Sequence, residues 1–140
     1  LLDVRRVVNL RNPAHSLVKL MNPVDGPALL VSSYTHPEYA VSMADTFALV
    51  QANALLIRGT EGEAVADARR TPKMQAFVVG KATDLQAYQA GSLTALPELP
   101  TAIDAASTAT YIQSVLNGES PVPAPIAEQV AHILQLHQAL

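Results

Sequence analysis

Two acidic side chains in a glycine-containing loop offer the most direct chemistry in this sequence. Glu61 and Glu63 lie in the segment 59–63, which directly follows the apolar run 54–57. Mg²⁺ usually takes one or two protein carboxylates and completes its shell with water and substrate phosphates. The segment therefore predicts a magnesium-assisted phosphate site. The alternative is a solvated loop whose acids only neutralise nearby arginines, which are Arg58, Arg69 and Arg70.

His36 offers a second binding chemistry. It follows an apolar run and falls in the first turn of an expected helix, where backbone N–H groups collect anions. The hydroxyls available beside it for a phosphate or sugar contact are those of Ser32, Ser33 and Thr35. The alternative is that Thr35 and Glu38, which have the spacing of a capping box, only cap the helix.

Patterns for dedicated metal, nucleotide or esterase sites do not occur. The four histidines, at positions 15, 36, 132 and 137, form no His-Glu-x-x-His pattern. Gly-x-Gly-x-x-Gly, the Walker loop and Gly-x-Ser-x-Gly are missing as well. The sequence has no Cys, which excludes a disulfide scaffold and a thiolate zinc site and is compatible with a reducing cytosol.

Charge is divided unevenly along the chain. Residues 1–81 hold all 9 Lys and Arg with 7 of the 12 acids, a balance of +2, whereas residues 82–140 hold only acids, a balance of −5. The most basic stretch is the N-terminal one, which contains Arg5, Arg6, Arg11 and Lys19. Such a cluster is a nucleic-acid footprint only when the fold gathers it on one surface, and is otherwise a solvated helix face.

Pro and Gly divide the first half of the sequence into alternating helical and extended segments. We expect helices at 3–10 and 13–21, the second burying Leu17, Leu20 and Met21. Apolar runs at 28–33 and 54–57 predict buried strands. The helix between them begins near Thr35 and is expected to bury Val41, Ala44, Phe47, Ala48 and Gln51. Strand, helix and strand then form a βαβ unit.

The second half of the sequence predicts two further strands and two further helices. Residues 73–79 and 85–89 form a pair of strands joined across 80–84. A helix is expected from about Ser107 to Asn117-Gly118, because glycine is common just after a helix end. A final helix from about Ile126 is expected to bury an apolar face made of Val130, Ile133, Leu134 and Leu136.

Length and composition indicate one packed globular domain. The chain has 140 residues, of which 49% are apolar and 15% charged. No run approaches eighteen apolar residues, so we expect no membrane association and a cytoplasmic location. Because the sequence begins with Leu1, we interpret it as part of something longer.

Three segments together resemble a known family. They are Arg-Asn-Pro-Ala-His-Ser-Leu-Val-Lys-Leu at 11–20, Ser-Ser-Tyr-Thr-His-Pro-Glu-Tyr at 32–39, and Ala-Leu-Leu-Ile-Arg-Gly-Thr-Glu-Gly-Glu at 54–63. Their order and spacing match, and the likeness continues through 111–113 and 117–121. The sequence thus resembles the YbiB-type branch of the anthranilate phosphoribosyltransferase superfamily over most of its length.

The resemblance implies a fold and an assembly. Residues 1–140 would form the C-terminal portion of a phosphoribosyltransferase-like α/β domain, with a mostly parallel sheet flanked by helices. The N-terminal helical domain and the glycine-rich loop for phosphoribosyl pyrophosphate would lie outside the chain. The full-length protein would be a homodimer.

The resemblance also implies a function. YbiB-type proteins are understood as sequence-independent binders of DNA or RNA, and the basic side chains here would serve that role: Arg5, Arg6, Arg11, Lys19, Arg58, Arg69, Arg70 and Lys73. The alternative is a phosphoribosyltransferase acting on anthranilate or a similar aromatic acceptor. In that case Arg11, His15 and His36 would bind substrate, and Glu61 and Glu63 would bind magnesium. The sequence departs from the transferases after Arg11 and at their adjacent Asp-Glu pair.

Overall fold

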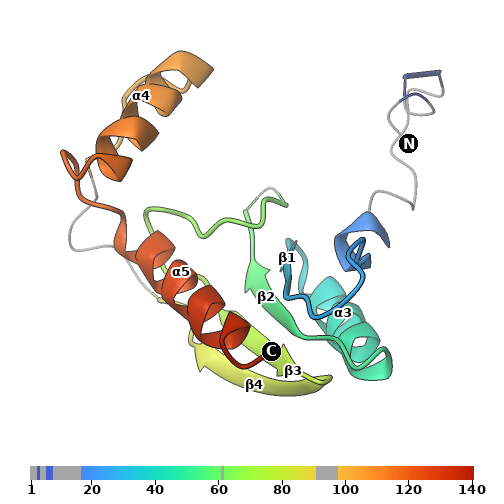
Figure 1. The fold of residues 1–140 in the computed structure, drawn as a ribbon. Coiled ribbons are helices and arrows are strands. Elements are labelled where there is room, and N and C mark those ends of the chain that lie inside the picture. The colour runs from blue at the N-terminus through green and yellow to red at the C-terminus, as the bar shows by residue number, and fades with distance from the viewer. Residues whose placement is uncertain (1–2, 4–5, 8–16, 61, 91–97) are drawn as a thin grey trace.

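The computed structural model describes residues 3, 6–7, 17–60, 62–90 and 98–140. Along the described chain the elements are η1 (Val18–Leu20), β1 (Leu30–Tyr34), α3 (Pro37–Leu49), β2 (Ala54–Arg58), β3 (Met74–Val78), β4 (Lys81–Gln86), α4 (Ala105–Leu116) and α5 (Ala124–His137). Figure 1 shows their arrangement. None of the described helices combines the length and the apolar character needed to cross a bilayer.

The four described strands form one mixed sheet in the order β1-β2-β3-β4. β1 and β2 are parallel, with Leu30 opposite Ala54 and Tyr34 opposite Arg58. The expected βαβ unit is therefore confirmed. β2–β3 and β3–β4 are both antiparallel. The expectation of a mostly parallel sheet is wrong, because β3 is followed by a tight hairpin, and a hairpin can join only antiparallel neighbours.

The β3–β4 hairpin turns on two residues in the left-handed region. Val79 has φ +48° and Gly80 has φ +73°. The turn packs against the end of α3, since a Cβ added to Gly80 would lie 2.9 Å from the carbonyl oxygen of Ala48. The second strand of the predicted pair thus begins at Lys81 rather than Leu85. Residues 81–84, which the sequence analysis places in the connection, pair with β3 instead.

Helix α3 packs on one face of the sheet. Met43 and Phe47 are buried, and Phe47 meets Phe77 of β3 with ring centroids 5.1 Å apart. The expected helix position is confirmed, but its expected buried face is only partly right. Val41 is 63% exposed, and Ala48 also faces solvent.

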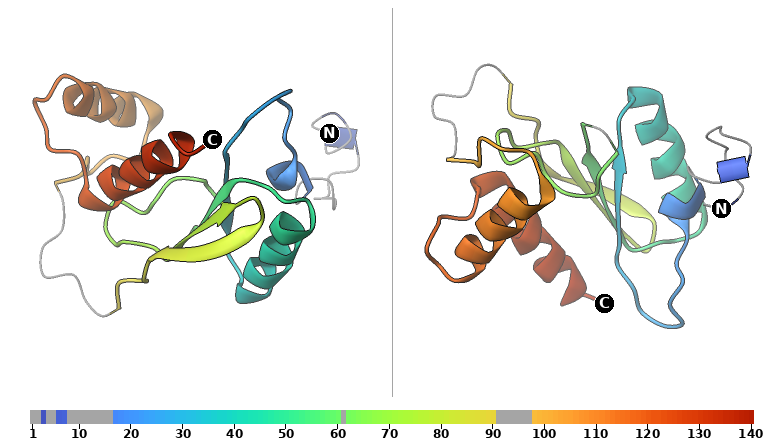
Figure 2. Two further views of the ribbon diagram at one scale, coloured as in Figure 1. Left: turned by 60° about the horizontal axis from the view of Figure 1, so that its bottom comes forward. Right: turned by 90° about the horizontal axis from the view of Figure 1, so that it is seen from above.

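Helix α5 covers the opposite face (Figure 2). Leu136 is buried in a cluster with residues of β2 and β3, and Ile126 and Ile133 pack against the same cluster. The expected burial of Val130 and Leu134 is wrong, since they are 47% and 56% exposed. Pro125 and Gln129, which lie outside the expected apolar face, are buried instead.

Helix α4 stands away from the sheet (Figures 1 and 2). It begins two residues before the expected Ser107, because the Asp104 side chain caps it by accepting a hydrogen bond of 2.9 Å from the Ser107 N–H. It ends at Asn117 and Gly118 as expected, with Gly118 at φ +75°. The helix has no buried residue.

The N-terminal helices are described only in part. Within the helix expected at 13–21, the structure describes the short 3₁₀ turn η1 at Val18–Leu20, and residues 13–16 lie outside the described residues. Leu20 packs against the α3 cluster, but Leu17 and Met21 are 60% and 61% exposed, so their expected burial is wrong. Most of the helix expected at 3–10 lies outside the described residues.

Candidate functional site

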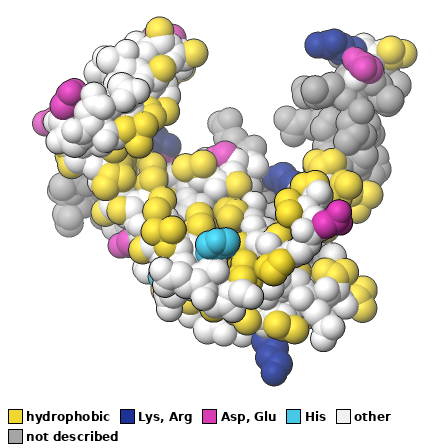
Figure 3. Space-filling view, viewed as in Figure 1, with side chains coloured by type: hydrophobic (Ala, Val, Ile, Leu, Met, Phe, Trp, Pro, Cys, Tyr) yellow, Lys and Arg dark blue, Asp and Glu magenta, His cyan; other side chains and the backbone are white. Residues whose placement is uncertain are grey.

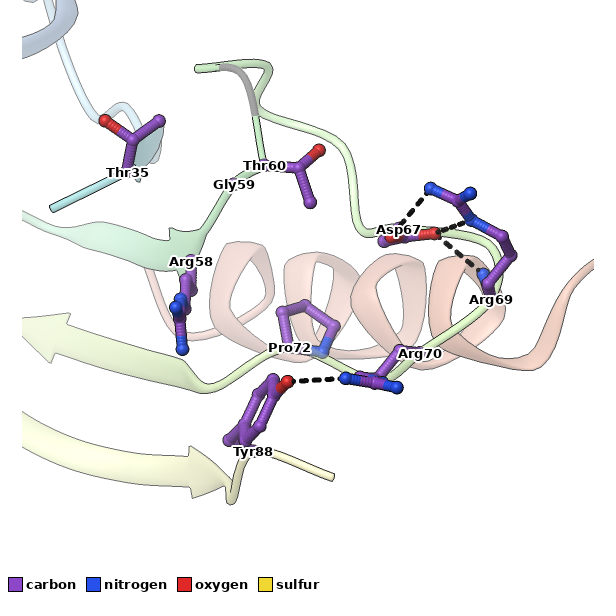
Figure 4. A pocket seen from close by; sticks show the side chains of 9 residues that line it. All are labelled: Thr35, Arg58, Gly59, Thr60, Asp67, Arg69, Arg70, Pro72 and Tyr88. Atoms are coloured by element: carbon purple, nitrogen blue, oxygen red, sulfur yellow. Dashed lines mark hydrogen bonds and ion pairs between the residues drawn. The ribbon is translucent and has the colours of Figure 1, made fainter. Parts of the chain in front are cut away.

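A pocket of about 460 Å³ opens where the two parallel strands end (Figure 4). Thr35 directly follows β1, whereas Arg58, Gly59 and Thr60 end or follow β2. The carboxyl ends of parallel strands are where α/β folds place ligands. The rest of the lining comes from the connection between β2 and β3 and from the residues after β4: Asp67, Arg69, Arg70, Pro72 and Tyr88.

Two arginines meet the ring of Tyr88 in this pocket. The guanidinium carbon of Arg58 lies 5.3 Å from the ring centroid, and that of Arg70 lies 6.0 Å from it. Arg70 Nη1 also donates a hydrogen bond of 2.9 Å to the Tyr88 hydroxyl. Neither arginine forms an ion pair with a carboxylate of the described residues. Within the described part of the chain, no carboxylate therefore neutralises either charge.

The third arginine of the pocket is neutralised. Arg69 donates from Nε and Nη2 to the two carboxylate oxygens of Asp67, at 3.0 and 3.2 Å, and its backbone N–H donates to the same residue at 2.9 Å. The side-chain hydrogen bond from Arg69 is the main reason why the pKa of Asp67 lies below its ordinary value. Figure 4 shows Asp67 and Arg69 joined to each other, apart from Arg58 and Tyr88.

The loop after β2 is closed by one of the predicted acids. Glu63 Oε1 accepts hydrogen bonds of 2.8 Å from both the N–H and the hydroxyl of Thr60. A Cβ at Gly59 would lie 2.9 Å from the Glu63 carbonyl oxygen, so only glycine fits this close approach. Glu61 lies outside the described residues. Within the described part of the chain, no three His, Cys, Asp or Glu side chains gather in a way that could hold a metal ion.

Helix α5 positions the segment that carries two of the arginines. Gln129 is 4% exposed, accepts a hydrogen bond of 2.8 Å from the Ala66 N–H and donates one of 2.9 Å to the Ala64 carbonyl. Five residues further along, the Thr71 hydroxyl donates to Glu128 at 3.3 Å. Residues 64–71 are thus attached to α5 at both ends.

His36 takes a different position from either sequence interpretation. It is itself the N-cap residue of α3, and no side chain caps this helix, so the expected capping box is wrong. The Thr35 hydroxyl instead lies 2.8 Å from His36 Nδ1. His36 is exposed and outside the pocket lining, whereas Thr35 is part of it.

Lys19 holds three segments together. Its Nζ donates to the carbonyl oxygens of Gly62 at 3.1 Å and Ser33 at 3.4 Å. The Ser32 hydroxyl in turn donates to the Lys19 carbonyl. These contacts connect η1, β1 and the loop after β2, which directs the Lys19 charge toward the protein rather than toward the arginine pocket.

The remaining predicted basic residues lie apart from the pocket or outside the described chain. Arg6 pairs with Asp3 at 3.6 Å, and both side chains are almost fully exposed. Lys73 pairs with Asp84 across β3 and β4 at 3.4 Å. Arg5, Arg11 and His15 fall outside the described residues. Of the eight predicted nucleic-acid contacts, the pocket lining thus contains Arg58, Arg69 and Arg70.

Two residues that shape the pocket or its lining segment were not singled out from the sequence. Tyr88 follows β4 and carries no motif, although a lone aromatic in a chain with only 4% aromatic residues is itself a signal. Gln129 is polar within an apolar helix pattern, and its burial follows only from the loop that it meets. Both depend on contacts between residues distant in the sequence.

Comparison with known proteins supports part of the expected relationship. No family model matches the chain. The protein named "Uncharacterized protein YbiB" of Escherichia coli (strain K12) is 35% identical over 131 residues, which is 93% of this chain. The chain spans 40% of the length of that relative. The link to the anthranilate phosphoribosyltransferases stays a prediction. Over nearly its whole length, the chain is therefore related to part of YbiB.

Proposed function

We propose that the chain binds DNA or RNA without sequence preference, through the pocket lined by Arg58, Arg70 and Tyr88. The observation that supports this function is the pair of arginines at Tyr88, neither of which has a carboxylate partner among the described residues. Guanidinium groups match phosphate oxygens in geometry and charge. Phosphate contacts of this kind carry no base information, so the binding is independent of sequence.

Tyr88 adds an aromatic surface to the charged one. Tyr88 is 42% exposed, so a base of a single strand can reach part of this residue. Stacking of a base on an aromatic side chain contributes about 1–3 kcal/mol and tolerates every base. The Arg70 hydrogen bond to the hydroxyl fixes the ring at the pocket. Charge and stacking together favour a single-stranded nucleic acid.

Arginine substitutions test the electrostatic part. Arg58→Gln and Arg70→Gln should each weaken binding to a fluorescent oligothymidylate in an anisotropy titration. The slope of log K against log salt should fall by about 0.7 for each lost phosphate contact. Lys81→Gln, which removes an exposed charge at the far end of the sheet, is the matched control. Equal slopes for all of these proteins would contradict the proposal.

Two further substitutions separate charge from stacking in the same titration. Asp67→Asn removes the negative charge beside the pocket and should strengthen binding, opposite in sign to the arginine variants. Tyr88→Leu should weaken binding about fivefold or more, whereas Tyr88→Phe keeps the ring and should lose much less. If leucine and phenylalanine gave the same loss, the ring would have no stacking role.

The phosphoribosyltransferase alternative is decided by turnover. Three of the residues it needs, Arg11, His15 and Glu61, lie outside the described part of the chain, so no contact of the described residues favours it. The full-length protein is incubated with phosphoribosyl pyrophosphate, magnesium and anthranilate, and the product is measured by fluorescence. Clear product formation that is lost in Glu61→Gln would replace nucleic-acid binding as the leading function.

A further inference from the structure

The residues that line the pocket at the ends of β1 and β2 have the charge that a dianion would balance. The described lining contains three arginines and one aspartate, a balance of +2. Asp67 pairs with Arg69, whereas Arg58 and Arg70 have no carboxylate partner among the described residues. Both of these guanidinium groups approach the Tyr88 ring, with their carbon atoms 5.3 and 6.0 Å from its centroid. Because two like charges in one pocket repel each other, a ligand with two negative charges fits better than one with a single charge.

Other hydrogen-bond donors of the pocket are largely in use. The N–H groups of five lining residues already donate to other atoms of the described chain, namely those of Arg58, Gly59, Thr60, Arg69 and Arg70. Pro72 has no N–H. The hydroxyls of Thr60 and Tyr88 have partners as well, Glu63 and Arg70. An anion in this pocket is therefore held mainly by guanidinium groups and not by a cradle of backbone amides.

The phosphates of a nucleic acid differ in charge between the interior and the end of a strand. An internal phosphodiester carries a single negative charge. A terminal phosphomonoester carries a charge of about −1.5 to −2 at pH 7 and offers three acceptor oxygens. The terminal group thus matches two guanidinium groups in charge and in acceptors, whereas a phosphodiester matches one.

The shape of the surface also favours a single nucleotide over a long stretch of strand. The pocket has a volume of about 460 Å³, within the range of about 300–1,000 Å³ typical of sites for small ligands. The described Lys and Arg side chains on the face drawn in Figure 3 form separate spots, not a continuous strip. A groove that follows the backbone of a strand needs such a strip.

We propose that this pocket binds the phosphomonoester at the end of a DNA or RNA strand, with the phosphate between Arg58 and Arg70 and the terminal base beside Tyr88. The inference rests on the proposed function and specifies which part of the nucleic acid the pocket takes. The ligand chemistry is a phosphomonoester attached to a nucleoside, which a strand end shares with a free mononucleotide.

The test is a competition titration with the full-length protein and a fluorescent oligothymidylate that has no terminal phosphate. Unlabelled oligothymidylates of one short length compete with it and differ only in the terminal group: a 5′-phosphate, a 3′-phosphate, a 5′-methyl phosphate, or hydroxyls at both ends. At least one of the two terminal phosphates should compete about tenfold better than the hydroxyl strand, because it adds charged hydrogen bonds. The methyl phosphate keeps the phosphorus but loses one charge, so it should gain much less.

Variants of the protein assign this preference to the pocket. Arg58→Gln and Arg70→Gln should each remove most of the preference for the terminal phosphate. Lys81→Gln, at an exposed position at the other end of the sheet, should keep it. The phosphorylated and hydroxyl strands are compared within each protein, so a general loss of affinity does not imitate the expected result.

The other outcomes overturn the inference in distinguishable ways. Equal competition by phosphorylated and hydroxyl strands would exclude recognition of the strand end but leave the proposed function in place, because both strands would still bind. Failure of every strand to bind would remove the proposed function as well. A preference that survives both glutamine variants would place the terminal phosphate elsewhere. Thymidine 5′-monophosphate that competes as well as the phosphorylated strand would assign the pocket to free mononucleotides.

Discussion

At the scale of single residues, the charge of the pocket depends on which arginines have a carboxylate beside them. Asp67 and Arg69 are two residues apart in a turn in which the Arg70 N–H donates to the Asp67 carbonyl at 3.2 Å. This turn brings the Asp67 carboxylate onto the Arg69 guanidinium and leaves Arg70 directed at Tyr88. Of these three arginines, Arg69 is paired with a carboxylate, whereas Arg58 and Arg70 have no carboxylate partner among the described residues.

The Asp67–Arg69 pair predicts a pH dependence of stability. The pKa of Asp67 is lowered in the folded chain by the hydrogen bond from Arg69, so the folded state binds the proton less well than the unfolded state. The resulting stabilisation is present above the unfolded pKa of about 3.9 and is lost as pH falls through the lower folded pKa. Urea unfolding should therefore show Asp67→Asn to be less stable than the parent at pH 7, with the difference shrinking below pH of about 4.

The control for that measurement is Asp45→Asn. Asp45 is exposed on α3 and forms no hydrogen bond or ion pair with the described residues. The difference between this variant and the parent should be small and should change little between pH 7 and pH 3. A constant difference for Asp67→Asn over the same range would show that its carboxylate is not coupled to folding.

At the scale of elements, α5 has two roles. Its apolar side covers the sheet through Ile133 and Leu136, and its Gln129 side chain binds the backbone of residues 64–66. The second role matters for the pocket, because the connection between β2 and β3 has no regular structure of its own to place Arg69 and Arg70. A helix distant in the sequence thus positions the arginine segment.

Gln129→Leu tests this role of α5. Leucine keeps an apolar side chain of similar size but leaves the buried Ala66 N–H without a partner, which costs about 1–3 kcal/mol of the free energy of unfolding. Urea denaturation measures the change. Gln135→Leu on the exposed side of the same helix should alter stability by less than about 0.5 kcal/mol. If the two substitutions had equal effects, the Gln129 hydrogen bonds would not anchor the segment.

At the scale of the whole molecule, the sheet joins two apolar clusters into one fold. β2 alternates between them, because Leu55 and Ile57 face α5 whereas Ala54 and Leu56 face α3. All of these side chains are essentially buried. Because β2 is buried on both faces, we expect the α3 side and the α5 side of the sheet to unfold together.

Phe77→Ala tests this dependence. Removing the buried ring loses its contact with Phe47 and leaves a cavity, at a cost of about 3–5 kcal/mol. Because a domain of this size is only marginally stable, the chain should be largely unfolded or should unfold at much lower urea. Val78→Ala, the next residue but 41% exposed, is the control and should change little. If the α3 amides of Phe77→Ala lost their protection from hydrogen exchange while those of β3 and α5 kept it, the two sides of the sheet would be independent.

The sequence by itself determined those strands and helices that are specified by residues within the strand or helix. The apolar runs at β1 and β2, the intervening helix α3 and the glycine after α4 were all predicted close to their observed positions. These signals are short-range, since burial on both faces, proline geometry and positive φ each affect a few neighbouring residues. The basic residues Arg58 and Arg70 were identified for the same reason, from their type and from the strand that precedes the first of them.

Only the tertiary structure decided which of these residues meet. Tyr88 reaches Arg58 and Arg70 because β3 and β4 return the chain past the end of β2. The sequence predicts a pair of strands here, but not that the pair lies beside β2. Gln129 is buried rather than Val130 because a loop some sixty residues away offers it a donor and an acceptor. Hydrogen bonds and ion pairs between distant segments depend on the path of the whole chain, and a periodic pattern within one segment carries no information about that path.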